Sequence, residues 1–435
     1  MNDKKTKGSI VGLLPLIAFL VIYMGIGIFT GSFDNMPLMV GIIIAVGIGL
    51  LLPHPEKDKK VSFEERVNIM CRGGGDYTLI QIVLIYILAG AFYGVANSMH
   101  AVDSVVNIGL TILPSNMILP GLFLIGCLLS FSMGTSMGTV AALIPIGVEV
   151  ANKTGINVAL VCGIVVGGAM FGDNLSFISD TTIAATRTQE VEMKDKFKTN
   201  ILMVLPAVIL NVVLLFFFSG GSMVTENPGS FDIVNLIPYV LVIVLSILGM
   251  NVVAVMSLGV FSGMLIGVIH GDFTWLQSLT VIHDGMSGME DMAVITIFVG
   301  GMVALMQYLG GIDYLLEKLT AGTKSAKGGE LSIAALVSLL DIATTNNTVS
   351  IIAAGPIARD IADKFEIDRK RVASILDIFS SAFNGLLPYA GQLLVAGGLA
   401  GITPTDIMVY NWYSMLMLVF GVIFILIGFP KFQNK

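Results

Sequence analysis

The chain has 435 residues, of which 55% are hydrophobic and only 12% are charged, with a formal net charge of −7 and a mean hydropathy of +0.90. Soluble globular domains carry about 25% charged residues, so this composition excludes a soluble protein and predicts an integral membrane protein. The three cysteines are scattered without a CxxC pair, which argues against a disulfide framework or a zinc site. We expect no cofactor and no nucleic-acid partner.

Apolar runs long enough to cross about 30 Å of hydrocarbon recur along the whole chain, which predicts an all-α polytopic protein. The first run follows the basic segment MNDKKTK. Because that run is about twenty residues long and lacks a small-x-small cleavage site, it is interpreted as the first span and not as a signal peptide. In chain order, the predicted spans include residues 10–29, 38–52, 79–96, 117–131, 201–218, 233–250 and 408–429.

Two halves of the chain carry similar features in the same order. TSMGTVAALIP aligns with TTNNTVSIIAA, which places Thr139 on Thr348 at an offset of 348 − 139 = 209. GDN then meets AFN, which places Asn174 on Asn384 at an offset of 384 − 174 = 210. Further upstream, GGGDYTLIQIVLIYILAG resembles SGMEDMAVITIFVGGMVA, each after a short amphipathic stretch. A fixed offset indicates an internal repeat, and the predicted repeats are residues 8–219 and 230–430.

The charges of the loops predict that the two repeats have opposite orientations. HPEKDKKVSFEERVNIMCR, in the first half, holds five Lys or Arg residues, whereas its counterpart HGDFTWLQSLTVIHDG holds none. The positive-inside rule makes the first segment cytoplasmic and the second external. We therefore expect an inverted-topology repeat with both termini cytoplasmic. The predicted cytoplasmic loops are 57–66, 194–198, 324–327 and 369–371, and the predicted external ones lie at Asp103, Glu226 and Asp272.

With these sides fixed, the chain must enter the membrane and turn back at GTSMG, which predicts a re-entrant hairpin. The next apolar helix, VALVCGIVVGGAM, is predicted to break at GDNLS. The second half repeats this arrangement, with TTNNT as the hairpin tip and FNGLLP as the break in a discontinuous helix. Irregular backbone at membrane depth is tolerated only where it is buried in protein or lines a watery cavity. These polar segments therefore predict a binding site for a hydrophilic substrate near the midplane.

Four aspartates lie at that predicted depth. An ionised Asp at the bilayer centre costs about 2.5–3.5 kcal/mol, so each must face a shared interior, a cation or one another. Asp173 and Asp180 flank the first break and are the predicted Na⁺ ligands, although either one alternatively caps a half-helix. Asp341 and Asp377 lie near the second tip and break, where ion binding and a satisfied core carboxylate both remain open.

Neutral polar residues extend this predicted ion- or substrate-binding set. Unwound carbonyls suit Na⁺ and half-helix N-termini suit anions, whereas hydrogen bonding between helices is the alternative role for Ser, Thr and Asn in membranes. The members of this set are Thr135, Ser136, Thr139, Asn174, Ser176, Thr344, Asn346, Asn347, Thr348 and Asn384.

GTSMGTVAALIP, GGAMFGDNLSFISDTTIAATRTQ and ATTNNT together resemble the NhaC-type sodium/proton antiporter family, part of the wider ion-transporter superfamily. The resemblance covers nearly the whole chain and implies two inverted repeats with hairpins. It also implies Na⁺/H⁺ exchange, although relatives exchange malate for lactate or carry amino acids. In this sequence it implies a site that faces TTNNT and consists of Asp173, Asn174, Ser176, Ser179, Asp180 and Thr181.

We therefore expect a secondary active antiporter of the cytoplasmic membrane that exchanges Na⁺ (or Li⁺) for H⁺ by alternating access. The alternative is a Na⁺- or H⁺-coupled carrier of a small carboxylate or amino acid, which the Asn- and Thr-rich tips favour. A channel needs a continuous pore, which broken repeats do not suggest. GGGD fits the GxGD of intramembrane aspartyl proteases, but no YD dipeptide occurs in the chain, so we expect no enzyme. Membrane lipid surrounds the protein, and a homodimer is left open.

Overall fold

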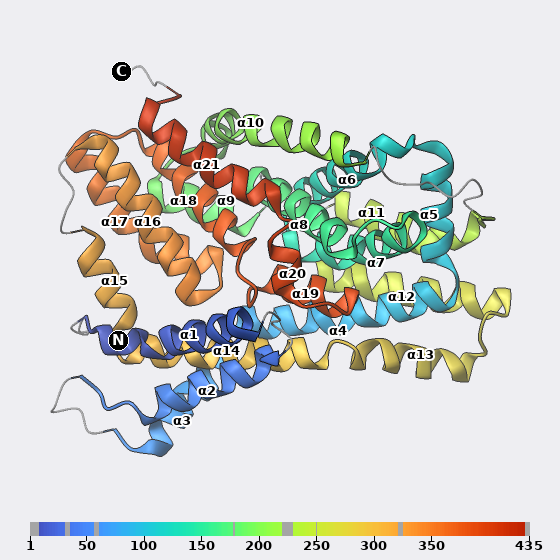
Figure 1. The fold of residues 1–435 in the computed structure, drawn as a ribbon, viewed down its shortest axis with the longest axis horizontal. Coiled ribbons are helices and arrows are strands. Elements are labelled where there is room, and N and C mark those ends of the chain that lie inside the picture. The colour runs from blue at the N-terminus through green and yellow to red at the C-terminus, as the bar shows by residue number, and fades with distance from the viewer. Residues whose placement is uncertain are drawn as a thin grey trace.

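The computed structural model describes residues 8–30, 35–55, 61–176, 179–219, 229–248, 250–320 and 325–430. Within these ranges every regular element is a helix (Figure 1), which confirms the all-α prediction. Residues 57–60, Glu226 and Lys324, which belong to predicted loops, lie outside the described residues.

The first half of the chain begins with a short 3₁₀ helix at Ile10–Leu13. Its α-helices are α1 (Leu14–Thr30), α2 (Leu38–Leu51), α3 (Phe63–Gly74), α4 (Tyr77–Ser98), α5 (Ala101–Ile112), α6 (Ile118–Met133), α7 (Ser136–Thr154), α8 (Val158–Leu175), α9 (Asp180–Gln189) and α10 (Met193–Ser219).

The second half follows with α-helices in a matching order. They are α11 (Ile237–Ile247), α12 (Val252–His270), α13 (Trp275–Ser287), α14 (Glu290–Tyr308), α15 (Gly311–Thr320), α16 (Ala326–Thr344), α17 (Asn347–Phe365), α18 (Arg369–Asn384), α19 (Gly391–Ala400), α20 (Pro404–Met408) and α21 (Trp412–Ile427).

Six helical stretches among the described residues are long and apolar enough to cross a membrane, by length and composition. They are Ile10–Gly27, Leu79–Ser98, Met193–Phe218, Val252–His270, Glu290–Tyr308 and the stretch Val158–Gln189, which consists of α8, α9 and the short segment between them that includes the undescribed residues 177 and 178.

The helices in four of the predicted spans are shorter than a full membrane span. Residues 38–52, 117–131, 233–250 and 408–429 contain apolar helices of 10–17 residues. The 14-residue α2 is about 21 Å long at 1.5 Å per residue, less than the roughly 30 Å of a hydrocarbon core. Asn411 caps the start of α21, so this helix begins at Trp412 and not at residue 408. Hydropathy alone does not detect such ends.

The helix ends of the two halves correspond at a constant offset. The left-handed residue that ends α6 is Gly134 and the one that ends α16 is Thr345, so the offset is 345 − 134 = 211. The prolines inside α7 and α17, Pro145 and Pro356, are also 356 − 145 = 211 residues apart. This offset is two residues larger than the offset of 209 from the sequence alignment, which placed Thr139 on Thr348.

Helices from the two halves pack against each other in reciprocal pairs. α3 packs against α14 and α13 packs against α4, as Figure 1 shows. Glycines permit the close approach: a Cβ on Gly73 would lie 2.6 Å from the carbonyl oxygen of Gly300, and one on Gly285 would lie 2.3 Å from that of Gly90. Such contacts between small residues are typical of membrane helices. The halves are therefore interleaved and do not form two separate lobes.

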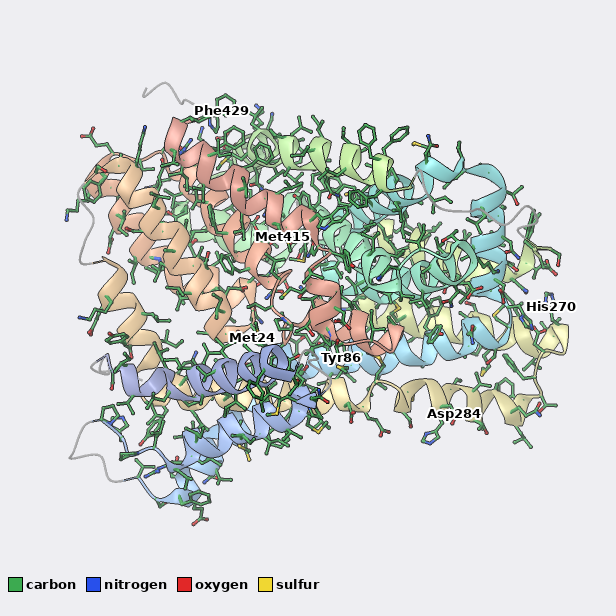
Figure 2. The ribbon with its side chains drawn as sticks, viewed as in Figure 1. Met24, Tyr86, His270, Asp284, Met415 and Phe429 are labelled. Carbon is green, nitrogen blue, oxygen red and sulfur yellow. The ribbon has the colours of Figure 1, made fainter. Side chains whose placement is uncertain are left out.

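The outer helices present apolar side chains to the surroundings. Phe217 of α10 is 74% exposed and Ile269 of α12 is 71% exposed. Figure 2 shows Phe429, just after α21, and His270, at the end of α12, toward opposite ends of the long axis. Large apolar groups on the outside suit a lipid solvent, which leaves the interior for polar and ionisable side chains.

Candidate functional site

Two turns from different halves of the chain open into one cavity of about 440 Å³. In the α6–α7 turn, Thr135 caps α7, and its hydroxyl accepts a hydrogen bond from the backbone N–H of Gly138 at 3.5 Å. In the α16–α17 turn, the side chain of Asn346 accepts one from the N–H of Val349 at 3.0 Å. The cavity contains nine of the sixteen residues predicted for the site: Thr135, Ser136, Asp173, Ser179, Asp180, Thr181, Asn346, Asn347 and Thr348.

Asp173 is the buried carboxylate of this cavity and is 5% exposed. The Ser136 hydroxyl donates to its Oδ2 at 2.8 Å, and the Ser179 hydroxyl donates to its Oδ1 at 2.5 Å. The Thr181 hydroxyl lies 2.9 Å from that of Ser179. Asp180 also lines the cavity, but its side chain is exposed and not partly desolvated as predicted. No Lys, Arg or His among the described residues forms an ion pair with Asp173.

The donor set of the cavity consists mainly of neutral oxygens around the two carboxylates. Within the part of the chain that the structure describes, no three His, Cys, Asp or Glu side chains converge as they do in a multi-ligand metal centre. Hydroxyl, amide and carboxylate oxygens suit a hard cation such as Na⁺. The cavity therefore has the chemistry for an alkali cation that enters and leaves, and not for a firmly held transition metal.

Gln392, which was not predicted, also lines the cavity, and it joins the second half of the chain to Asp173. It lies in α19, and its Nε2 donates to the Ser136 hydroxyl at 3.0 Å. Gln392 occupies the position that corresponds to Thr181, since 392 − 181 = 211. An offset of 211 residues from the predicted site residue Thr181 would therefore have identified Gln392.

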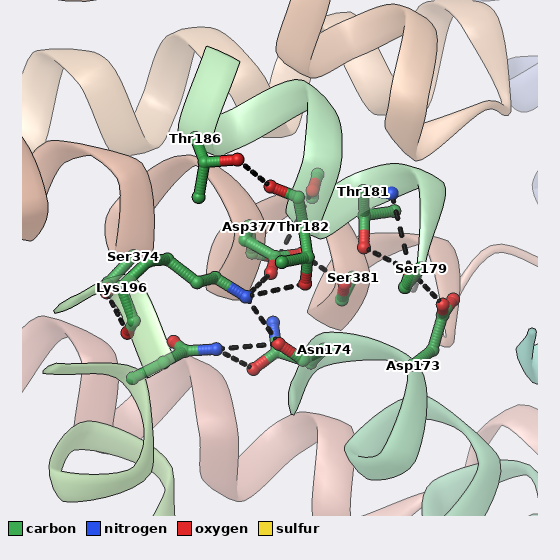
Figure 3. A network of polar contacts seen from close by, with 12 residues as sticks. Asp173, Asn174, Ser179, Thr181, Thr182, Thr186, Lys196, Ser374, Asp377 and Ser381 are labelled. Atoms are coloured by element: carbon green, nitrogen blue, oxygen red, sulfur yellow. Dashed lines mark hydrogen bonds and ion pairs between the residues drawn. The ribbon is translucent and has the colours of Figure 1, made fainter. Parts of the chain in front are cut away.

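A second polar cluster surrounds Lys196, whose side chain is fully buried (Figure 3). Its Nζ forms an ion pair with Asp377 and donates to the carbonyl oxygen of Asn174 at 2.5 Å and to Thr182 Oγ1 at 3.0 Å. Asn200 donates to the same carbonyl oxygen at 2.8 Å. Asn174 and Asp377, both predicted site residues, thus lie in this cluster and not among the residues that line the cavity.

Lys196 was predicted to lie in a cytoplasmic loop because its segment, MKDKFK, is rich in lysine. The structure places that segment in the first turns of α10, with Lys194 and Lys198 exposed and Lys196 buried. The missed signal is helical spacing: Lys196 starts a stripe of positions three or four residues apart that continues through Asn200, Met203, Ala207 and Asn211, all buried.

Asp341 forms a third cluster, also outside the lining of the cavity. Its side chain is fully buried, and Oδ1 accepts from the Ser350 hydroxyl and from Asn384 Nδ2, each at 3.4 Å. Thr344 lies beside Ser350, with their hydroxyl oxygens 2.9 Å apart. Oδ2 of Asp341 has no hydrogen-bond partner among the described residues.

The first helix break begins later than the sequence predicted. GDNLS was expected to be unwound, but α8 continues to Leu175, and the N–H of Ser176 still donates to the carbonyl oxygen of Gly172 at 2.9 Å. Gly172 stays helical because it packs tightly on α6, where a Cβ would lie 2.3 Å from the backbone nitrogen of Phe131. Ser176 therefore caps the helix, whereas Thr139 lies inside α7 and donates to the carbonyl oxygen of Thr135 at 3.0 Å.

Comparison with known proteins agrees with the membrane-protein composition. The model of the Na⁺/H⁺ antiporter family matches residues 6–221 and 228–429. The malate-2H⁺/Na⁺-lactate antiporter of Bacillus subtilis is 23% identical over 98% of this chain and 96% of its own, and the Na⁺/H⁺ antiporter NhaC of the same organism is 25% identical over 91% and 92%. The arginine/ornithine antiporter ArcD of Halobacterium salinarum is 21% identical over 97% and 92%.

The crystal structure of the YdaH transporter of Alcanivorax borkumensis aligns with 96% of this chain and 99% of its own, at 14% identity and a TM-score of 0.43. The family model covers both halves of the sequence and nearly all described helices. The chain therefore belongs to the Na⁺/H⁺ antiporter family, and it is a multi-pass membrane protein and a secondary transporter, not an enzyme.

Proposed function

We propose that the protein exchanges Na⁺ (or Li⁺) for H⁺ across the cytoplasmic membrane, with Asp173 as the group that binds either ion. The observation that carries this proposal is the buried Asp173 carboxylate, which lines the cavity and has hydroxyl partners and no ion pair among the described residues. A bare buried charge is costly, so the site is occupied by a cation or a proton when it changes sides. Proton and Na⁺ compete for the same oxygens, which produces exchange.

The other cavity residues complete the ion site in this proposal. Ser136 and Ser179 fix the orientation of the Asp173 carboxylate, and Asp180 attracts the cation from the open part of the cavity. Asn346 and Asn347 supply neutral groups from the opposite turn. In this proposal Asp173 carries the proton, and the two turns form opposite sides of the cavity.

We further propose that residues 8–219 and 230–430 are inverted repeats that alternate access to the cavity. The α6–α7 and α16–α17 pairs are the re-entrant hairpins, and α8–α9 and α18–α19 are the discontinuous helices. The constant offset of 211 between helix caps and the reciprocal packing of α3 on α14 and α13 on α4 support a pseudo-two-fold relation. The unequal Lys and Arg content of equivalent loops supports opposite orientation, with both termini cytoplasmic.

A carrier of a small carboxylate or amino acid is the second candidate, and the size of the cavity favours it. The cavity volume of about 440 Å³ is within the range of about 300–1,000 Å³ for small-molecule sites and exceeds what one alkali cation needs. Gln81, Asn251 and Gln392 add amide groups to its lining. Two relatives, the malate/lactate antiporter and the arginine/ornithine antiporter, are also named as exchangers of organic solutes.

Flux through purified protein in proteoliposomes distinguishes the two candidates. A Na⁺ gradient imposed without organic solute is expected to drive proton movement, detected with an entrapped pH-sensitive dye, while a choline gradient drives none. Malate, lactate, arginine and ornithine are then added one at a time. Proton movement driven by Na⁺ alone supports Na⁺/H⁺ exchange, and its absence until an organic solute is present contradicts it in favour of the second candidate.

A further inference from the structure

The ammonium group of Lys196 lies in a complete cage of oxygens. A lysine has three N–H donors and no acceptor, and here three oxygens receive them: the carbonyl of Asn174, the hydroxyl of Thr182 and the carboxylate of Asp377. Lysine is almost never fully buried unless it is paired. Lys196 is fully buried, and all three N–H groups of its ammonium are hydrogen-bonded.

These ligands are of the kind that bind alkali cations. One carboxylate, one hydroxyl and one main-chain carbonyl form the cage, and the Asn174 carbonyl lies in the last turn of α8, where the helix dipole is negative. In transporters such C-terminal helix ends commonly coordinate Na⁺. The cage also bridges the first break, because Asn174 belongs to α8 and Thr182 to α9.

The second half of the chain shows that a free carbonyl at a helix end does not itself require a charged partner. At the end of α18, the carbonyl oxygen of Gly385 accepts a hydrogen bond from the neutral amide of Asn411 at 2.7 Å. At the first break, Asn200 already supplies an equivalent amide to the Asn174 carbonyl. The charge of Lys196 therefore has a purpose beyond capping, and Asp377 is the group that it neutralises.

We propose that Lys196 is a tethered cation that permanently fills a second monovalent-cation site, formed by Asn174, Thr182 and Asp377, so that this site takes no ion from solution. The site is separate from the cavity at Asp173 and does not depend on which solute the cavity carries. Its consequence for transport is that the helix break stays neutral throughout the cycle, and only the cavity is loaded and emptied. Removing the ammonium while keeping Asp377 opens the site to a free cation.

Counting bound Na⁺ tests this proposal. Equilibrium binding of ²²Na⁺ to purified protein in detergent is compared for the wild type, Lys196→Ala, the double variant Lys196→Ala with Asp377→Asn, and the matched control Lys198→Ala, which removes an exposed lysine from the same helix. We expect Lys196→Ala to bind one more Na⁺ per protein than the wild type. The double variant has no charge to neutralise and is expected to return to the wild-type number, as is Lys198→Ala.

Thermal stability provides the second readout. If Lys196 had only a structural role, added cations would not stabilise the Lys196→Ala variant selectively. Na⁺ or NH₄⁺ is expected to raise the melting temperature of Lys196→Ala more than that of Lys198→Ala, because a ligand bound only to the folded state stabilises it, while choline is expected to have no such effect. A Lys196→Ala protein that binds no additional Na⁺, or that fails to fold even with Na⁺ or NH₄⁺ present, overturns the proposal. Since the readout is a difference from the wild type, wild-type protein without Na⁺ binding or flux would contradict only the proposed function.

Discussion

The surroundings of each buried aspartate determine what it can bind. Asp377 is neutralised by Lys196, and Asp341 lies in its own cluster outside the lining of the cavity. Asp180 reaches the cavity but is exposed. Asp173 alone among these four combines burial, the cavity and hydroxyl partners. The four carboxylates, which the sequence placed at similar depth, therefore have different surroundings in the structure.

Replacing Asp173 by Asn is expected to abolish or strongly weaken exchange, because Asn keeps the size of the side chain but cannot carry the proton or the charge. Losing a charge-assisted contact of about 1.5–3 kcal/mol corresponds to a loss of about tenfold to more than hundredfold in Na⁺ affinity. Na⁺-driven proton flux in proteoliposomes measures it. Glu149→Gln is the control, since Glu149 pairs with Lys153 and does not line the cavity. Unchanged exchange by Asp173→Asn would make this carboxylate structural.

Thr345 adopts a left-handed backbone conformation at the second turn, with φ of +54°. That conformation costs a residue with a Cβ about 1–2 kcal/mol, and Gly134 avoids the cost at the corresponding position. Thr345→Gly is therefore expected to stabilise the protein by up to about 1 kcal/mol, because glycine loses about 0.5–1 kcal/mol of the gain through backbone entropy. The melting temperature in detergent is the measurement. Gly134→Thr is the reciprocal control and is expected to lower it.

At the scale of helices, the sequence indicates positions of turns better than the exact ends of helices. Glycine and asparagine in GTSMG, TTNNT and FNGLLP disfavour continued helix. α6 ends directly before the first of these segments, and α16 and α18 end within the other two. The first break was predicted too early, since close packing of Gly172 on α6 holds it in the helix. That contact joins residues about forty positions apart, so local propensity cannot reveal it. Helical spacing could have indicated that Lys196 is buried, but it could not reveal its partners, which come from three other helices.

The close contact between α4 and α13 depends on glycine. A Cβ on Gly90 would lie 2.2 Å from the carbonyl oxygen of Gly285, which is backbone and cannot rotate away. Gly90→Ala is therefore expected to destabilise the protein by about 1–3 kcal/mol, the usual range for overpacking. Gly25→Ala in α1 is the matched control, since nothing lies within 4 Å of its added Cβ. Equal melting temperatures for the two variants would show that α4 and α13 are not held in this contact.

At the scale of the whole molecule, the interleaved packing of the two halves could not be predicted from the sequence. The similar order of features in the two halves could be detected in the sequence, but the packing of α3 on α14 and of α13 on α4 could not. Those pairs bring together residues about two hundred positions apart, and no local pattern encodes them. The α6–α7 and α16–α17 turns, which are also about two hundred positions apart, line one cavity.

The proposed inverted orientation is tested by labelling single cysteines with an impermeant reagent. Cys71 is the exposed native cysteine and Cys127 and Cys162 are buried, so Asp272→Cys is built with Cys71→Ser. Asp272 follows α12 and is exposed. We expect reaction from the external side for Asp272→Cys and only from the cytoplasmic side for native Cys71 in the unaltered chain. Labelling of Asp272→Cys from the cytoplasm alone would contradict the inverted repeats.

The proposed competition of proton and Na⁺ at one carboxylate would make the whole transport cycle depend on pH. If proton and Na⁺ share the oxygens of Asp173, lowering the pH fills the site with protons, so apparent Na⁺ affinity falls as pH falls. The limit is about tenfold per pH unit for each proton displaced, which is 1.36 kcal/mol. Na⁺ titrations of proton flux between about pH 6 and pH 9 measure this slope, with Glu149→Gln expected to retain it. A Na⁺ affinity that stays constant across this range, with exchange intact, would mean that the two ions bind at different places and that another group couples them.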